Sequence, residues 1–296
     1  LNKIPVSNIN VSNILGLAHV IENYQIVRST NGFLDRFELW ESVFRERQRN
    51  TIHNLDSKNS ADEVYFQTSR RHLLSIGIKP STPIVLLHIR NNGNKHEVRN
   101  ANPETYVDAV RALQDKGFQV CQIGTNKFND LSQYLPGVTS LYSDNSTTNS
   151  LDYYLLTNCS LYIGTTSGPS IFPSLYGVPS LITNLTSMSR NSFSSESVLY
   201  LPKKLRRLNG KLVSIEDTFS SRFSFGGEYL NRQLSASGFA LENNSSEEIC
   251  SAVAELLERL DISSLKETDL DVKVREIQIK SKTASFGLFS NTFLLS

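Results

Sequence analysis

The stretch Leu161–Asn184, which reads LYIGTTSGPSIFPSLYGVPSLITN, decides the fold. It opens with an apolar strand over Leu161–Ile163 and passes through the loop Gly164–Gly168. It continues into a helix over Pro169–Tyr176 and ends with a second apolar strand over Ser180–Ile182. A strand, a helix and a strand joined by short loops form a βαβ unit, whose two strands run parallel in one sheet.

The same alternation is present on the N-terminal side of this unit. Asn102-Pro103-Glu104 opens a helix with a capping residue and a proline in the first turn, and Gly117 ends that helix. Further strands are expected at Ile84–Ile89, Phe118–Ile123 and Thr139–Tyr142, and a further helix at Ser150–Thr157. The strands are continuous apolar runs, which is typical of strands buried on both faces. The sequence therefore predicts an α/β fold with a Rossmann-like parallel sheet and helices on both faces.

Two regions follow from this pattern. Residues 1–80 form an N-terminal partial or helical region, whose last helix, Glu63–Ile78, is stopped by Pro80. Residues 81–296 form the Rossmann-like domain. Within it, residues 185–245 are polar and irregular, and a capping box at Ser245-Ser246-Glu247-Glu248 starts a helix that ends near Leu260.

Composition excludes several classes of function. Thirty basic residues against 29 acidic residues leave a net charge of +1, so no overall field favours nucleic acid. The three cysteines lack metal-ligand spacing, and their odd number favours a reducing compartment. No apolar run reaches the roughly 20 residues of a membrane span, and no signal peptide is present.

Ligands of an open parallel sheet bind at the carboxyl ends of its strands. This rule brings the loops that begin at Gly124 and Asn184 into one crevice with the loop Gly164–Gly168. In that last loop, Thr166 and Ser167 supply hydroxyls, Gly164 and Gly168 let a ligand approach the backbone closely, and the following helix start attracts anions. The alternative is an ordinary strand-to-helix turn with a serine cap.

The loop after the strand Ile84–Ile89 is about a dozen residues long, whereas such loops usually have two to six, which favours a functional role. Arg90 and Arg99 lie at its two ends and are suited to grip a diphosphate by forked hydrogen bonds. His88 and Arg90 share one face of the strand end. His88 is either a catalytic group or a buried histidine bonded to the backbone.

Candidate general bases are Glu97, His96, His88 and Asp152. The alternative for Glu97 is a solvated loop carboxylate, and for Asp152 a helix cap. We interpret Asp269-Leu270-Asp271 as surface rather than as a metal site. The basic cluster Lys203–Arg207 is interpreted as a solvated face, with a phosphate or lipid-headgroup contact as the alternative.

These residues, in this order, resemble a family of bacterial glycosyltransferases encoded among surface-polysaccharide genes. The resemblance covers roughly residues 84–296. The His-X-Arg strand end is also similar to that of protein O-fucosyltransferases, where the arginine serves the donor diphosphate, and the Ser-Gly…Gly-Val-Pro arrangement occurs in heptosyltransferase-like enzymes. The segments that carry the resemblance are His88-Ile89-Arg90, Arg99-Asn100-Ala101, Tyr106, Gly117, Gly124, Ser150-Leu151-Asp152, Ile163–Gly168, Tyr176–Pro179, Asn184, Leu201–Lys204, Glu242–Ile249, Ser285-Phe286 and Asn291…Leu295.

The resemblance implies a GT-B-like architecture whose N-terminal domain is abbreviated or missing here. It assigns Arg90 to the phosphates of a nucleotide-sugar donor and Thr166, Ser167 and Gly168 to the phosphate loop. The family often has an acidic residue directly after His-X-Arg, where Asn91 stands in this chain.

The implied function is transfer of a sugar to a hydroxyl of a bacterial surface polysaccharide or its lipid-linked precursor. Neither a metal nor a cofactor is expected besides the donor itself. The implied location is cytoplasmic or peripheral at the inner membrane, and other modules of a polysaccharide synthase are candidate partners. The alternatives are a nucleotide-sugar epimerase on a related scaffold and a non-catalytic module that binds a glycan or a partner.

Overall fold

The structure is a computed structural model of the 296-residue chain. It describes residues 26–29, 32–35, 60–79, 81–91, 97–124, 130–142, 148–186, 197–218, 234–261, 264–280 and 288–295. The chain divides into two compact units, Leu1–Leu55 and Asp56–Ser296. The described residues of the first unit form an antiparallel pair, β1 (Ile26–Ser29) and β2 (Gly32–Asp35).

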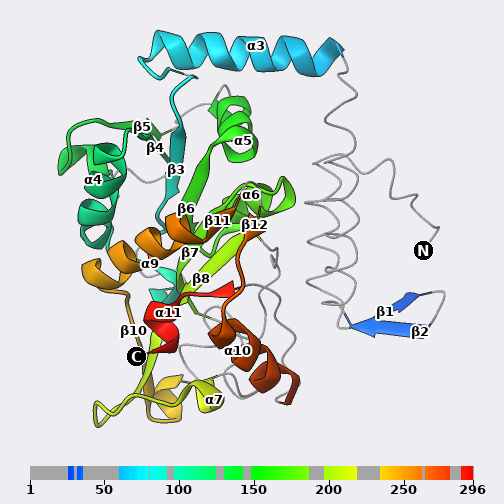
Figure 1. Cartoon of the computed structure of the whole chain (residues 1–296), viewed down its shortest axis with the longest axis vertical. Coiled ribbons are helices and arrows are strands. Elements are labelled where there is room, and N and C mark those ends of the chain that lie inside the picture. The colour runs from blue at the N-terminus through cyan, green and yellow to red at the C-terminus, as the bar shows by residue number, and fades with distance from the viewer. Residues whose placement is uncertain are drawn as a thin grey trace. The chain divides into compact units, whose positions relative to one another are not determined.

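The second unit is built on a seven-stranded sheet in the order β13-β8-β7-β6-β3-β4-β5 (Figure 1). Every neighbouring pair in it runs parallel, which confirms the predicted α/β fold with a Rossmann-like sheet. The strands are β3 (Ile84–His88), β4 (Gln119–Gly124), β5 (Val138–Tyr142), β6 (Leu161–Thr165), β7 (Ser180–Leu185), β8 (Val198–Pro202) and β13 (Leu288–Phe289).

Strands β8 and β13 were not predicted. The sequence around β8 had been interpreted as irregular because polar residues surround a run of only five, but all five residues of β8 are buried. Strand β13 is a two-residue strand, too short to show a pattern. Two short antiparallel pairs were not predicted either, because their strands are too short or too exposed to show an apolar pattern. They are β9 (Lys204–Arg207) with β10 (Phe239–Glu242) and β11 (Leu260–Asp261) with β12 (Ser264–Leu265). An isolated bridge also joins Arg206 to Leu212.

Helices lie on both sides of the sheet. Figure 1 shows α4 to one side of β3 and α5 to the other, and α9 packs against α4, β7 and β8. The helices are α3 (Ser60–Ser75), α4 (Val107–Asp115), α5 (Thr148–Asn158), α6 (Ile171–Leu175), α7 (Ile215–Thr218), α9 (Ser246–Arg259), α10 (Asp269–Lys280) and α11 (Asn291–Leu294), with short 3-10 turns η2 (Glu97–Arg99), η3 (Pro103–Tyr106), η5 (Leu131–Gln133) and η6 (Gly168–Ser170).

Two predicted helix starts are confirmed. The Asn102 side chain accepts a hydrogen bond of 3.1 Å from the Glu104 backbone N–H, directly before η3 and α4. At the start of α9, the Glu248 backbone N–H donates to the Ser245 hydroxyl at 3.3 Å. The Ser245 backbone N–H donates in return to the Glu248 carboxylate at 2.8 Å. These local signals act within four residues, so the sequence alone is enough to set them.

The helix α3 packs with the sheet unit. The rings of Phe66 on α3 and Tyr154 on α5 meet edge to face with centroids 5.5 Å apart, and Leu73 is fully buried. The compact unit that holds the sheet therefore begins at Asp56. The division into domains after residue 80 stays a prediction, because these contacts do not test whether either part folds alone.

The Asp269-Leu270-Asp271 segment was interpreted as surface, and for Asp271 this was wrong. Its side chain is 4% exposed and accepts bonds from the Arg259 guanidinium and, at 3.0 Å, from the Phe289 backbone N–H. The carboxylate thus joins α9, α10 and β13. No local pattern indicates these contacts, because the partners lie 12 and 18 residues away.

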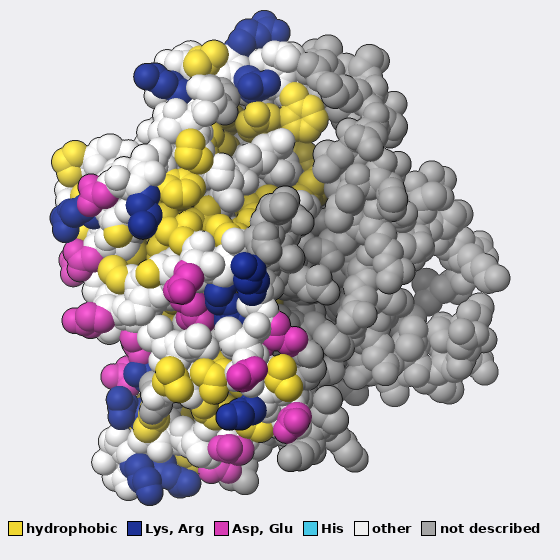
Figure 2. All heavy atoms as spheres, in the orientation of Figure 1, with side chains coloured by type: hydrophobic (Ala, Val, Ile, Leu, Met, Phe, Trp, Pro, Cys, Tyr) yellow, Lys and Arg dark blue, Asp and Glu magenta, His cyan; other side chains and the backbone are white. Residues whose placement is uncertain are grey.

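Charges are intermixed on the face shown in Figure 2, where basic and acidic side chains alternate over the described surface. This agrees with the net charge of +1. No helix among the described residues combines the length and the apolar character that crossing a bilayer requires.

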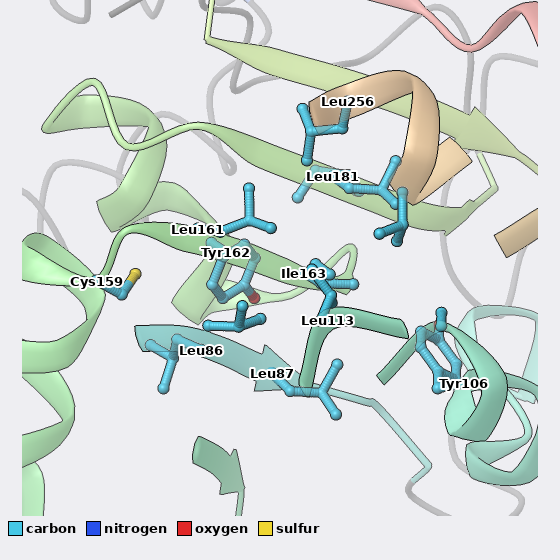
Figure 3. Packing of buried hydrophobic residues seen from close by; sticks show 14 of the residues in the cluster. Leu86, Leu87, Tyr106, Leu113, Cys159, Leu161, Tyr162, Ile163, Leu181 and Leu256 are labelled. Carbon is cyan, nitrogen blue, oxygen red and sulfur yellow. The ribbon is translucent and has the colours of Figure 1, made fainter. Parts of the chain in front are cut away.

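The core between β3 and β6 holds Leu86, Leu87, Tyr162 and Ile163, all within one packed cluster (Figure 3). Tyr162 is completely buried and leans along β6 over Gly164, so that a Cβ added to Gly164 would lie 2.5 Å from the phenolic oxygen. Gly164 was predicted to let a ligand approach the backbone. The structure gives a different reason for this glycine, which is that the protein's own tyrosine fills the space.

Replacing Gly164 with alanine is expected to lower the free energy of unfolding by about 1–3 kcal/mol, because the core is overpacked. The matched control is Gly168→Ala in the same loop, where an added Cβ meets nothing within 4 Å. We expect that variant to stay within about 0.5 kcal/mol of the parent. Urea denaturation of both variants measures this, and equal losses would contradict the assignment.

Candidate functional site

The strand order reverses between β3 and β6. From β3 the chain adds β4 and β5 on one side, then returns to place β6 on the other side of β3, followed by β7 and β8. In open α/β sheets the loops on either side of such a reversal diverge and leave a crevice at the carboxyl edge. His88 near the end of β3 is the register partner of Gly164 on β6. The candidate site is therefore the edge just beyond this pair.

The loop after β3 folds back onto the loop after β6. The Arg90 backbone N–H donates to the Thr165 hydroxyl at 3.0 Å, and the Ala101 N–H donates to the Arg90 carbonyl at 2.9 Å, which closes the long loop. From the far end of that loop, Arg99 Nη2 donates to the Thr166 carbonyl at 2.8 Å. The structure thus brings together Arg90, Arg99 and the Thr165–Gly168 loop, as the sequence predicted.

Two donors at this edge lack protein partners. Arg90 Nε and the Thr166 hydroxyl are both buried and, among the described residues, form no hydrogen bond. Buried polar groups in proteins are almost always paired with protein atoms, water or a ligand, so two such atoms on adjacent loops mark this edge as a candidate ligand site. The Arg90 guanidinium stays charged, although burial lowers its pKa. An anion is therefore the ligand that matches it best.

His88 lies against the same loop. Its Nδ1 is 3.0 Å from the Ser167 hydroxyl. Burial and the nearby charge of Arg90 lower the pKa of His88 from 6.5 to about 4, so the imidazole is neutral near pH 7. A group with so low a pKa is a weak base, and the contact suits His88 to orient the Ser167 hydroxyl. Its catalytic role stays a prediction.

The other three candidate bases have different outcomes. Asp152 was also interpreted as a helix cap, which is wrong, since α5 begins four residues earlier at Thr148. Its Oδ1 is buried without a partner among the described residues, and burial raises its pKa to about 6. Glu97 lies in η2, but its side chain, like the whole of His96, is outside the described residues. Both carboxylates remain predictions as bases.

Asn184 has a structural function. It adopts a φ of 51° at the end of β7, and it is 1% exposed. Its backbone N–H donates to Asn244 Oδ1 at 2.6 Å, the Asn244 N–H donates back to Asn184 Oδ1 at 3.0 Å, and its Nδ2 donates to the Tyr106 hydroxyl at 3.1 Å. The amide thus joins β7 to the start of α9 and to η3. A contact of Asn184 with a donor stays a prediction.

Gly124 is the last residue of β4 and pairs with Tyr142 of β5, whereas it was expected to begin the loop after that strand. The residues directly after it, 125–129, lie outside the described part of the chain. Its assignment to the donor site therefore also stays a prediction. Of the described residues, no group of three His, Cys, Asp or Glu side chains is placed to hold a metal ion.

Sequence reasoning missed Lys203, which it placed in a solvated basic cluster. This residue follows β8, is 2% exposed, and donates from Nζ to the Asn100 carbonyl at 2.8 Å and to Asn243 Oδ1 at 2.5 Å. Burial lowers its pKa to about 8. A signal was present: Lys203 comes just beyond the apolar strand Val198–Pro202, on the same edge where Arg90 follows β3.

No protein-family model and no curated protein matches the sequence. Among solved structures, the fold is similar to a glycosyl transferase family 9 protein from Veillonella parvula, with 13% identity over 66% of this chain and 52% of that chain and a TM-score of 0.49. It is also similar to the ADP-heptose LPS heptosyltransferase II of E. coli, with 14% identity over 49% and 44% of the two chains and a TM-score of 0.39. A UDP-GlcNAc 2-epimerase from Neisseria meningitidis gives 14% identity over 51% and 38%, with a TM-score of 0.32.

The chain spans about half the length of the first of these structures. At such low identities and scores, the likenesses carry no information on activity. We therefore derive the function from the residues at the carboxyl edge of the sheet.

The neutral state of His88 predicts an acid-sensitive fold. An unfolded histidine binds a proton near pH 6.5 and the folded one only near pH 4, so the free energy of unfolding falls as the pH drops between these values. The His88→Gln variant lacks this proton. Relative to it, the parent should lose roughly 2–3 kcal/mol between pH 7 and pH 4. Urea denaturation at several pH values measures the difference, and parallel curves for the two proteins would show that the inference is wrong.

Proposed function

We propose that this chain is a GT-B-type glycosyltransferase that transfers a sugar from a nucleotide-sugar donor to a hydroxyl of a glycan. One observation carries the proposal: at the strand-order reversal, where an anionic ligand of an α/β sheet is expected, Arg90 Nε and the Thr166 hydroxyl are buried donors without a partner among the described residues. A nucleoside diphosphate supplies acceptor oxygens that match these donors.

The proposed chemistry breaks the bond between the anomeric carbon and the diphosphate and forms a bond from that carbon to the acceptor oxygen. The acceptor hydroxyl gives its proton to a base, and the departing diphosphate takes up the negative charge. Arg90 stabilises this charge directly, and its backbone is held by bonds to Thr165 and Ala101 before the reaction begins. Arg99 holds the Thr166 carbonyl and so keeps the phosphate loop in position.

On this proposal the arginines supply the positive charge, and no metal takes part. Asp152 is the better base among the two with described side chains, because a pKa of about 6 lies closer to neutral pH than the value of about 4 at His88. The acceptor that we propose is a bacterial surface polysaccharide or its lipid-linked precursor, reached from the cytoplasmic side of the inner membrane.

Replacing Arg90 with alanine should weaken binding of a nucleoside diphosphate by about 10- to 100-fold, the effect of losing a charged hydrogen bond. Titration calorimetry with ADP, GDP, UDP and TDP measures this. The matched control is Arg111→Ala on α4, since Arg111 is exposed and pairs only with its helix neighbour Asp108 among the described residues. Equal binding by the parent and Arg90→Ala would refute the assignment.

A second measurement separates transfer from isomerisation. Incubation of the chain with a matching nucleotide-sugar and no acceptor should leave the sugar unchanged, apart from slow hydrolysis. Conversion of the sugar to its epimer without an acceptor would replace the proposed transferase with an epimerase. Chromatography of the nucleotide-sugars detects either outcome.

A further inference from the structure

A second hollow lies at the same edge of the sheet. Its volume is about 660 Å³, and it lies between the end of the long loop after β3 and the β9–β10 pair. This is a typical size for a small-molecule site. Part of its wall is apolar and includes Leu208, Leu234 and Phe239. The polar wall consists of Asn91, Asn100, Asn102, Lys203, Ser235 and Asn243.

Arg99 and Asn100, in the described end of the long loop, lie between this cavity and the phosphate loop. On one side, the Arg99 guanidinium donates a hydrogen bond to the Thr166 carbonyl of the phosphate loop. On the other side, the carbonyl of the next residue, Asn100, accepts a hydrogen bond from Lys203 in the cavity. Asn91, directly after Arg90, lines the cavity. The two sites are therefore neighbours that share one wall but use different side chains.

Charge in the cavity is unbalanced. Lys203 is buried, and its two bonded partners, the Asn100 carbonyl and the Asn243 amide, are both neutral. No ion pair joins Lys203 to an acidic group within the described part of the chain, and none of the described residues lining the cavity is Asp or Glu. By contrast, Lys204 and Arg206 next to it pair with Glu248 and Glu242. A buried cation without an anion is costly, so it is a natural place for an anionic ligand.

Two amides add donors of the right kind. Asn243 accepts from Lys203 through its oxygen, and Asn102 accepts from the Glu104 N–H through its oxygen. These two bonds use the amide oxygens and not the NH2 groups, which are hydrogen-bond donors. Carboxylates and phosphates only accept hydrogen bonds, so they match a wall of one ammonium and two NH2 groups.

We propose that this cavity is a second anion subsite, which binds a sugar bearing a carboxylate or a phosphate with Lys203 as its counter-charge. The apolar wall packs against the sugar ring. The inference extends the proposed transferase by naming an acidic sugar as a substrate, but the binding of the free sugar does not depend on a nucleotide.

The test uses the whole chain and three free sugars: D-glucuronate, glucose 6-phosphate and glucose. Titration calorimetry or a thermal shift at millimolar sugar should show binding of at least one anionic sugar and at least tenfold weaker binding of glucose. A response to glucuronate alone identifies a carboxylate ligand, and a response to glucose 6-phosphate alone identifies a phosphate ligand. Equal responses to all three, or none, would overturn the proposal.

A matched pair of variants locates the site. Ser235 lines the cavity and Ser237 does not, and both side chains are exposed, so aspartate is tolerated at either position. Ser235→Asp should weaken binding of the anionic sugar at least tenfold by like-charge repulsion, and Ser237→Asp should leave it within about twofold. Lys203→Met should abolish it, with circular dichroism to check folding. Equal effects of the two aspartates would overturn the assignment.

Arg90→Ala separates this inference from the proposed function. That variant should lose nucleoside diphosphate binding and keep the anionic sugar. Loss of both ligands would place the sugar at Arg90 and overturn the second subsite. Failure of the parent chain to bind any nucleotide, with sugar binding intact, would count against the transferase alone.

Discussion

The parallel pairing of β3 with β6 is the constraint on which the site depends. It sets His88 beside Gly164 in register, and the buried phenol of Tyr162 lies over Gly164. Because the strand order reverses here, the two following loops leave the edge on either side of one crevice. The bond from the Arg90 N–H to the Thr165 hydroxyl then ties these loops together. A change in the register of this one pair would displace Arg90 from Thr166.

Buried polar groups at this edge fall into two kinds. Asn184, which holds the frame, is paired with Asn244 and Tyr106. Those at the proposed binding surfaces are incompletely matched, as Arg90 Nε and the Thr166 hydroxyl have no described partner and Lys203 has only neutral ones. Protein interiors rarely leave such groups without a partner unless a ligand or water meets them.

Much of the site could be predicted from the sequence. Arg90, Arg99 and the Thr166–Gly168 loop lie together because they follow strands, and parallel strands end on one edge whatever the details of packing. Asp152 and Asn184 show the limit of that reasoning. The side chain of Asp152 lies a full turn inside α5, and Asn184 is engaged by Asn244, which is 60 residues away. Contacts at such separations depend on how the elements pack, which periodicity does not describe.

The sequence by itself determined the βαβ alternation, the Asn102 and Ser245 caps and the edge at which the chemistry lies. All of these follow from interactions within a few residues or from the geometry common to parallel sheets. Only the tertiary structure decided the rest: that Gly164 makes room for Tyr162, that β8 and β13 extend the sheet, and that Lys203 is buried while Lys204 and Arg206 are paired at the surface. The reason is that burial is set by what packs over a residue, and for Lys203 those partners come from Asn100 and Asn243, 103 and 40 residues away.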